Sequence, residues 1–337
     1  MANAWVAALS YVCPRCRGHL QTKVEAYTCA ACAVAYPIIL GIPDFRVLAD
    51  PWISIADDRE KALRLAQRST DFDFAATVRE YWSMTSSTPR HLAARYTAHV
   101  LTAEERVSEW LHAVEPNEVP GSDAVWLDIG CGTGDLIAAA AQRRQRVVGI
   151  DIALRWLVVA RKRLEQLGID SVLVCADGEH LPFSDAAFTR VFSLGTIEHC
   201  QRADNVIAEA RRVCSSRGIV RVRTVNRYSV LPEPHVGVWG VGFIPRAWAD
   251  RYVHWRSGQR YLHHRPLSPR ELGRALRAAK LGDVEVQPAR LLAQERERIP
   301  RRLRWTARAY DHVRTLPFGG AALAWLSPLL EARGVAP

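Results

Sequence analysis

The fold is decided by residues 124–135, Ala-Val-Trp-Leu-Asp-Ile-Gly-Cys-Gly-Thr-Gly-Asp, in which a short apolar run ends in an acid and three alternating glycines. The apolar run predicts a buried strand, and residues 135–142 predict the helix that follows it. Gly130, Gly132 and Gly134 allow a sharp turn between them and let a ligand approach the backbone closely. The free N–H groups of the helix then face that ligand. The stretch therefore predicts a ligand-binding turn.

Acidic residues follow three successive apolar runs of this region. Asp128 leads the glycines, and Asp151 ends the run 146–151, where a second parallel strand delivers a carboxylate to a ribose diol. Asp177 ends the run 171–177 and is an acceptor for an exocyclic amine. The spacing Gly-x-Gly-x-Gly departs from the Gly-x-Gly-x-x-Gly of dinucleotide folds, and the leading acid disfavours a pyrophosphate. We therefore expect a nucleoside ligand whose charged end is not a phosphate.

With these motifs in order, residues 120–225 resemble the class I S-adenosylmethionine-dependent methyltransferases, in particular the group similar to the quinone-biosynthesis enzymes. The resemblance implies an α/β fold with a Rossmann-like sheet, helices on both of its faces, and S-adenosylmethionine as the cofactor. It implies that the glycine motif holds the methionine portion, that Asp151 holds the ribose, and that Asp177 lies at the adenine amine. The cofactor residues that it implies are Asp128, Gly130, Gly132, Gly134, Asp151, Asp177, Gly178 and Glu179. A glycine turn in another doubly wound domain is the alternative, which the three acids disfavour.

Near the start of the chain, two Cys-x-x-Cys pairs are separated by twelve residues: Cys13 with Cys16, and Cys29 with Cys32. Thiolates on two such knuckles can converge on one tetrahedral zinc ion, and a closed four-cysteine site is structural. Disulfides are the alternative, disfavoured in a chain without a secretory signal. The following residues 36–45 are similar to the zinc ribbons that accompany methyltransferases as a fused domain or an activating subunit.

The length of 337 residues and the 49% hydrophobic composition predict one large core and a smaller attached module. The first residues lack a basic segment and a long apolar stretch, so we expect no secretory signal and a cytoplasmic location. We expect a zinc ribbon over 1–48, a helical segment covering the cofactor over 49–120, a cofactor-binding core over 121–290, and a basic, then apolar tail over 291–337.

The helical segment carries two aromatic residues that bear on the cofactor. Apolar positions recur at helical spacing over 55–115. Tyr81 and Trp82 could pack on the sulfonium end of the cofactor, because an aromatic face attracts a cation. Ordinary core packing is the alternative for both rings.

Two histidines are candidate bases. His199, with Glu198 beside it, follows the strand predicted over 188–195, at the sheet edge where ligands bind in open α/β folds. His235 lies in a Gly- and Pro-rich segment that predicts a substrate loop over 226–265. For either histidine, an ordinary hydrogen-bonding role is the alternative. His254, His263 and His264 show no recognisable metal-ligand spacing.

The C-terminal half is strongly basic. Residues 268–288 predict a capped helix and a strand that complete the core sheet. Residues 211–315 hold 23 Arg and Lys against 8 Asp and Glu, a net charge of +15, which points to an anionic partner. Residues 315–330 carry no charge but are too short to span a membrane. That run could lie in a membrane interface, pack on the protein's own core, or meet a second subunit.

We therefore expect a methyltransferase that acts on a small molecule, such as a specialised metabolite, a sugar, a quinone-like ring or a lipid-linked acceptor. The alternative is an RNA base methyltransferase that docks RNA with its zinc ribbon and basic half. Peripheral membrane contact through the C-terminal residues is compatible with the first reading. The sequence leaves the acceptor atom and the oligomeric state open.

Overall fold

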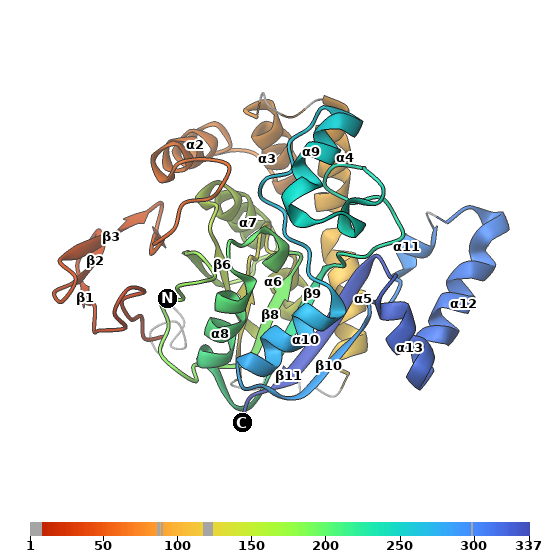
Figure 1. Cartoon of the computed structure of the whole chain (residues 1–337). Helices are drawn as coiled ribbons and strands as arrows, with labels where there is room; N and C mark the ends of the chain where they lie inside the picture. Colours follow the sequence, from red (N-terminus) through yellow and green to blue (C-terminus); the bar gives the residue numbers. More distant parts are fainter. Residues whose placement is uncertain (1–8, 86–87, 89, 117–123, 298) are drawn as a thin grey trace. The chain divides into compact units, whose positions relative to one another are not determined.

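The structure is a computed structural model that describes residues 9–85, 88, 90–116, 124–297 and 299–337. The chain divides into two compact units, Met1–Thr189 and Arg190–Pro337. Figure 1 labels many of the helices and strands of both. The expectation of no secretory signal falls on residues outside the described ranges, as does the boundary predicted at residue 120.

The first unit begins with a small antiparallel ribbon. Its strands are β1 (Gln21–Thr22), β2 (Ala26–Cys29), β3 (Val34–Ile39) and β4 (Ile42–Pro43). Each strand pairs with the next one along the chain. Phe45 is fully buried, and its ring centroid lies 5.1 to 5.3 Å from those of Tyr11, Tyr27 and Tyr36. This aromatic cluster supplies the small core that the ribbon packs around.

Helices follow the ribbon, in agreement with the helical segment expected over 55–115. They are α2 (Ile55–Arg68), α3 (Phe74–Ser83), α4 (Arg90–Leu101) and α5 (Ala103–Val114). The side chains of Ser54 and Asp73 cap α2 and α3 by accepting from backbone N–H groups three residues on, at 3.1 and 2.6 Å. These caps satisfy donors that the first turn of a helix otherwise leaves unpaired.

Parallel strands alternate with helices in the rest of the first unit. These elements are β5 (Val125–Ile129), α6 (Asp135–Ala141), β6 (Arg146–Asp151), α7 (Leu154–Gln166) and β7 (Val172–Cys175). β6 pairs with both β5 and β7, with Asp128 opposite Gly149 and Asp151 opposite Cys175. Gly149 leaves room for its neighbours, since a Cβ atom there would lie 2.6 Å from Cδ1 of Ile137 and would displace that side chain. The pairing places the acids that end β5 and β6 at one edge of the sheet.

The second unit carries the remaining strands of the sheet, including an antiparallel strand close to the C-terminus. Its regular elements include β8 (Phe188–Leu194, whose first residues belong to the first unit), η1 (Ile197–His199), α8 (Ala203–Val213), β9 (Cys214–Val225), α10 (Pro269–Ala278), β10 (Gly282–Pro288) and β11 (Leu329–Val335). β11 lies between β9 and β10 and is antiparallel to both. Ser268 and Glu271 form a capping box at the start of α10. The helix and strand predicted over 268–288 are therefore confirmed.

The last residues differ from the tail expected over 291–337, because β11 is an interior strand of the sheet. Leu330 and Ala332 are buried, and the backbone of β11 is paired on both sides. The Asn226 side chain fastens the chain just before β11, donating to the carbonyls of Ala324 and Ser327 at 2.9 and 2.7 Å. The second unit thus packs these residues on its own core.

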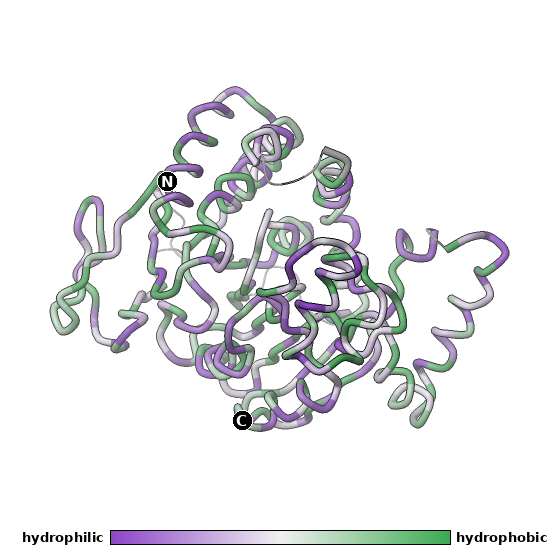
Figure 2. The backbone as a smooth tube through the Cα atoms, turned by 45° about the horizontal axis from the view of Figure 1, so that its top comes forward, coloured by the Kyte–Doolittle hydropathy of each residue, from purple (hydrophilic) through white to green (hydrophobic). Residues whose placement is uncertain are grey.

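Helical segments precede β11. They are α11 (Ala293–Glu297), η3 (Arg301–Leu303), α12 (Arg304–Thr315) and α13 (Pro317–Ala324). Figure 2 shows hydrophilic positions recurring along α12, whereas α13 carries no charged residue and is mostly apolar. Among the described residues, no helix is both long and apolar enough to cross a membrane.

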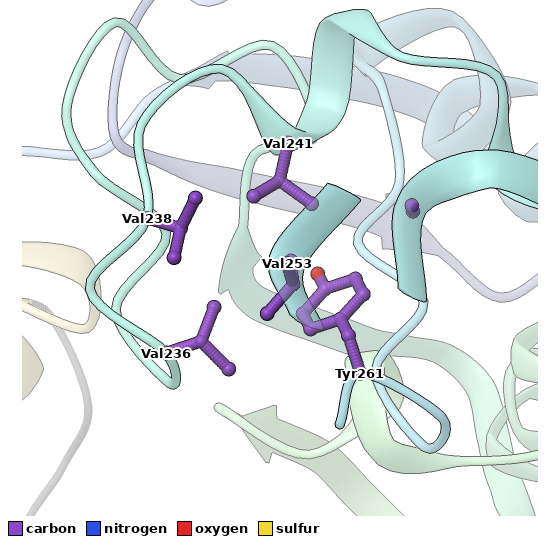
Figure 3. Packing of buried hydrophobic residues seen from close by; sticks show 6 residues of the cluster. Val236, Val238, Val241, Val253 and Tyr261 are labelled. Carbon is purple, nitrogen blue, oxygen red and sulfur yellow. The ribbon is translucent and has the colours of Figure 1, made fainter. Parts of the chain in front are cut away.

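The substrate loop predicted over 226–265 contains helices that the sequence did not indicate. They are η2 (Val241–Phe243) and α9 (Arg246–Ser257). Figure 3 shows that Val236, Val238, Val241, Val253 and Tyr261 pack together, so this segment has a small core of its own. A loop with its own core holds its side chains in place.

These elements confirm the predicted fold class: an α/β, Rossmann-like fold with a mixed sheet and helices.

Candidate functional site

The glycine turn after β5 has the backbone conformation that the sequence predicts. The φ angles of Gly130, Gly132 and Gly134 are 76°, 49° and 77°. Residues other than glycine rarely adopt this backbone conformation. The N–H groups of Gly130 and Cys131 both donate to the carbonyl of Ile150 at 2.8 Å. The turn is thereby fastened to the end of β6.

Asp151 completes this turn rather than standing apart from it. Its carboxylate accepts from the Gly132 N–H at 2.9 Å and from the Ala153 N–H at 2.8 Å. A carboxylate has about four acceptor positions, so both oxygens can still accept a hydroxyl. The structure therefore brings the predicted ribose acceptor and the predicted glycine motif together.

The charges around the turn favour a cation. Burial, together with the charges of Asp135 and Asp151, raises the pKa of Asp128 well above its usual range. Burial also raises the pKa of Asp151 to about 6; Asp50 adds to this, while two backbone hydrogen bonds and Arg155 oppose it. A pyrophosphate would add to this repulsion, whereas a cationic ligand relieves it. The residues thus fit the sulfonium and ammonium groups of S-adenosylmethionine.

Asp177 has partners that the sequence did not suggest. Its carboxylate accepts from the backbone N–H groups of Val47 and Leu48 at 2.9 and 3.0 Å, and it contacts Nδ1 of His180 at 2.7 Å. Gly178 and Glu179 form the turn that follows, and Glu179 is buried. Asp177 therefore holds the chain that leaves the ribbon, and its contact with an adenine amine stays a prediction.

Tyr81 and Trp82 lie in an aromatic cluster. The Tyr81 ring centroid lies 4.0 Å from that of Trp156 and 4.8 Å from that of Trp82. Lys61 already places its ammonium 4.5 Å from the centroid of the Tyr81 ring. The packing favours a core role for both rings.

The four ribbon cysteines converge as their spacing predicts. Their Sγ atoms all lie within 4.8 Å of one another, with Cys13 to Cys32 at 3.9 Å and Cys16 to Cys29 at 3.6 Å. Tetrahedral zinc with Zn–S bonds of about 2.3 Å requires sulfur atoms about 3.8 Å apart. All four are free thiols. The cluster is thus compatible with a structural zinc ion.

Both candidate bases belong to one cluster in the second unit. The ring centroids of His199 and His235 are 4.7 Å apart, and His264 lies 5.1 Å from His199 and 4.2 Å from His235. Burial and the neighbouring histidines lower the pKa of His264 to about 3. The sequence missed His264, because its partners lie 29 and 65 positions away and no local spacing relates them.

Two buried glutamates support the cluster. Glu233 accepts from the His235 side chain at 2.6 Å and from the backbone N–H groups of His235 and Val236 at 2.8 and 3.1 Å. Glu198 accepts from Thr224 at 2.8 Å, and its carbonyl accepts from the Arg265 N–H at 2.7 Å. The hydrogen bond between Arg265 and Glu198 therefore holds His264 and His199, their neighbours in the chain, close to each other.

The part of the chain that holds the glycine turn, Asp151 and Asp177 is similar to known proteins. Residues 127–222 match a protein family described as "Methyltransferase domain". Residues 127–222 are therefore assigned to a methyltransferase domain. The matched residues begin just before Asp128 and end within β9.

Individual relatives of the methyltransferase domain cover only part of the chain. The ubiquinone biosynthesis O-methyltransferase of Idiomarina loihiensis is 29% identical over 161 residues, 48% of this chain and 62% of that protein. The malonyl-[acyl-carrier protein] O-methyltransferase of Geobacter sulfurreducens is 33% identical over 136 residues, 38% of this chain and 47% of that protein. The chain thus spans less than two thirds of the length of these curated relatives.

A solved structure is similar at low identity. The SAM-dependent methyltransferase from Thermotoga maritima described as a possible histamine N-methyltransferase is 18% identical, with a TM-score of 0.45, and the match covers 73% of this chain and 97% of that one.

A buried ion network braces the methyltransferase domain from within the first unit. Asp58 of α2 pairs with Arg46 at 2.7 Å and with Arg155 of α7 at 2.5 Å. Its Oδ2 atom also accepts from the Leu154 N–H at 2.9 Å. Arg155 reaches Asp50 at 2.7 Å. These contacts hold the residues just after Asp151, and the sequence did not reveal them because each partner lies far along the chain.

A cavity of about 870 Å³ lies within the second unit. Its lining includes Glu233 and His264 of the histidine cluster, the buried ring of Tyr261, and apolar residues such as Val241. It also includes Arg202, Arg227, Arg246, Arg265 and Arg274. The carboxylates of Asp204, Glu233, Asp250 and Glu271 line it as well, and Glu271 pairs with Arg246 at 2.7 Å. The volume suits a small molecule, and the more numerous guanidinium groups suit an anionic one.

Proposed function

We propose that this protein transfers a methyl group from S-adenosylmethionine to a small, anionic acceptor. The observation that carries the proposal is the set of buried carboxylates around the glycine turn, within residues that match a methyltransferase family. The O-methyltransferase relatives make an oxygen acceptor the first choice. Because those relatives differ in substrate, the acceptor is argued from this chain's own residues.

Under this proposal, each acidic residue of the cofactor site contacts a different part of the cofactor. When bound, S-adenosylmethionine supplies the electrophilic methyl group. The carboxylate of Asp151 accepts the ribose hydroxyls while the Gly132 N–H keeps it in place. Asp128 faces the charged methionine portion, and Asp177 marks the adenine end. The chain's task is alignment and removal of water.

The cavity of the second unit is the proposed acceptor site. A mostly apolar space with arginines at intervals suits a ring or acyl chain that carries a carboxylate or phosphate. An acceptor hydroxyl gains the methyl group on its oxygen and gives up its proton. His199 and His235 are the predicted bases for that proton.

The ribbon is proposed to hold a structural zinc ion through Cys13, Cys16, Cys29 and Cys32. The sulfur separations near 3.8 Å support this. Peripheral membrane contact is supported by the exposed Trp305, which lies among the arginines of α12, and by the exposed Phe318 of the uncharged α13. Such contact suits a lipid-linked acceptor.

Tritiated S-adenosylmethionine and the purified full chain, added to an extract of the source organism, test the proposal. The extract is then divided into small-metabolite, lipid and RNA fractions, with Asp151→Ala, which should bind the cofactor weakly, as the matched control at a low cofactor concentration. Label in the metabolite or lipid fraction that depends on Asp151 supports the proposal. Label that ribonuclease removes replaces it with RNA methylation. Cofactor binding without label in any fraction contradicts methyl transfer.

A further inference from the structure

His199, His235 and His264 come from three separate segments and meet within the second unit. The first lies in η1, the second follows β9, and the third follows α9. One ring nitrogen of each can be chosen so that all three lie within 4.8 Å of one another. Imidazole nitrogen is the commonest protein ligand for divalent transition metals.

The spacing is close to that of a metal centre. Tetrahedral zinc with Zn–N bonds of about 2.1 Å needs nitrogens about 3.4 Å apart, so the rings must close by at most about 1.4 Å. Side-chain rotation covers such a distance. The half-buried rings already contact one another edge-on or stacked.

Glu233 provides a second and independent indication. Metal-bound histidines usually donate their other ring N–H to a carboxylate, which fixes the tautomer. The Glu233 carboxylate lies 2.6 Å from Nδ1 of His235, so Nε2 of that ring keeps the lone pair for a metal. Two backbone N–H groups and burial hold Glu233 itself in place.

The segments that bring the histidines together are well anchored. The apolar cluster in Figure 3 packs Val236, next to His235, against Val253 of α9 and Tyr261. The Arg265 N–H bonded to the Glu198 carbonyl holds the chain next to His264 beside η1. A preformed set of three ligands loses little entropy on binding an ion.

We propose that His199, His235 and His264 bind a divalent transition-metal ion, with zinc as the first choice. Three histidines with a further position open are the ligand set of catalytic rather than structural zinc. Since His264 and Glu233 also line the cavity, the open position suits an oxygen ligand of a molecule bound there.

This assignment changes the predicted role of His199 and His235 from bases to metal ligands. A divalent ion lowers the pKa of a hydroxyl that it binds, so the acceptor class becomes a phenol, enol or carboxylate oxygen that can reach the ion. The acceptor class rests on the proposed function, whereas the metal site does not.

Metal content of the unaltered full chain is the first measurement. After purification with zinc and removal of loose ions, mass spectrometry should find two zinc ions per chain, one for the ribbon and one for the histidines. Zinc absorption spectroscopy should show nitrogen as well as sulfur ligands. A single zinc with sulfur ligands alone, after zinc has been offered in excess, overturns the proposal without any variant.

Variants then assign the second ion. His264→Ala and the size-conserving His235→Gln should each bind one zinc, whereas His254→Ala, which removes an exposed histidine of α9, should keep two. Glu233→Gln should weaken the second site about 10- to 100-fold, as loss of a carboxylate behind a ligand does. Two zinc ions retained in His264→Ala and in His235→Gln would contradict the assignment.

Cobalt distinguishes the two sites and separates this proposal from the proposed function. Co²⁺ at the cysteines gives thiolate charge-transfer absorption, and Co²⁺ at the histidines does not. A second cobalt ion that binds to the unaltered chain without increasing these bands, and does not bind to His264→Ala, supports the site even if no methyl transfer is found. If methyl transfer is found but no cobalt binds at the histidines, the proposed function is supported and the proposed metal site is contradicted.

Discussion

At the scale of single residues, the cofactor site is defined by buried carboxylates whose negative charge the surrounding residues offset only in part. Asp128 and Asp151 lie at the ends of adjacent strands, and burial raises the pKa of both. Arg155 only partly offsets this at Asp151. Such a pair costs stability in the free protein, so a positively charged ligand gains binding energy by occupying the site.

Asp151→Ala should weaken S-adenosylmethionine binding by more than about 100-fold. Two hydroxyl hydrogen bonds to a charged acceptor are lost, and each bond of this kind contributes about 1.5–3 kcal/mol. Calorimetric titration measures the change, and Asp170→Ala, which removes an exposed carboxylate of the same unit, should leave the affinity unaltered. Full affinity in Asp151→Ala would place the ribose elsewhere.

Cofactor affinity should also depend on pH through the same residue. With a pKa of about 6, Asp151 is ionised at pH 7.5 and mostly protonated at pH 5, where it accepts hydroxyls poorly and carries no charge. Affinity should therefore fall as the pH drops through 6, and this fall should be reduced in Asp151→Ala. A pH-independent dissociation constant between 7.5 and 5 argues against the assignment.

The contribution of Asp151 to the stability of the free protein should change with pH in the opposite direction to its contribution to cofactor affinity. Its pKa is higher in the folded chain, about 6, than the ordinary value of 3.8, so the folded state binds the proton more tightly. The contribution of Asp151 to stability therefore rises as the pH falls from 6 toward 4. The difference in unfolding free energy between the natural chain and Asp151→Ala, measured by denaturant titration, should follow this sign.

At the scale of elements, the buried ion network sets the position of the cofactor strand ends. α2 contributes Asp58, α7 contributes Arg155, and Arg46 follows the ribbon. Arg46 also donates to the Ile152 carbonyl at 3.1 Å, one residue beyond Asp151. The network thus joins the pre-core helices to the edge where β6 ends.

Asp58→Ala should lower the free energy of unfolding by about 3–5 kcal/mol, because it leaves two buried guanidinium groups without their partner. The matched control is Glu60→Ala on the same helix, which removes an ion pair with Arg64 that is exposed on both sides. That change should cost less than about 1 kcal/mol. Denaturant titration compares the two, and equal losses would contradict a bracing role for the network.

At the scale of the whole molecule, the described residues of each unit contain one set of possible metal ligands. The first unit has the four cysteines, and the second has the three histidines. The ribbon has only short strands and an aromatic cluster to hold it together. A module this small depends on a metal or other cross-link for its fold.

Cys16→Ser should therefore remove one zinc ion and melt the ribbon at a lower temperature. The exposed Thr22→Ala in β1 is the control and should retain the metal. Metal analysis together with a thermal melt followed by circular dichroism measures both effects. Unchanged zinc content in Cys16→Ser would contradict a four-cysteine site.

The sequence alone determined what depends on neighbours in the chain. The glycines with their leading acid, the two Cys-x-x-Cys knuckles and the capped helix after Ser268 are local patterns, because turn conformation and helix capping are set within a few residues. The placement of β11 between β9 and β10, the partners of Asp177 and the meeting of His264 with His199 and His235 were decided only by the tertiary structure. These depend on contacts between distant segments, where the driving force is burial shared by the whole core, and no short spacing records which segments meet.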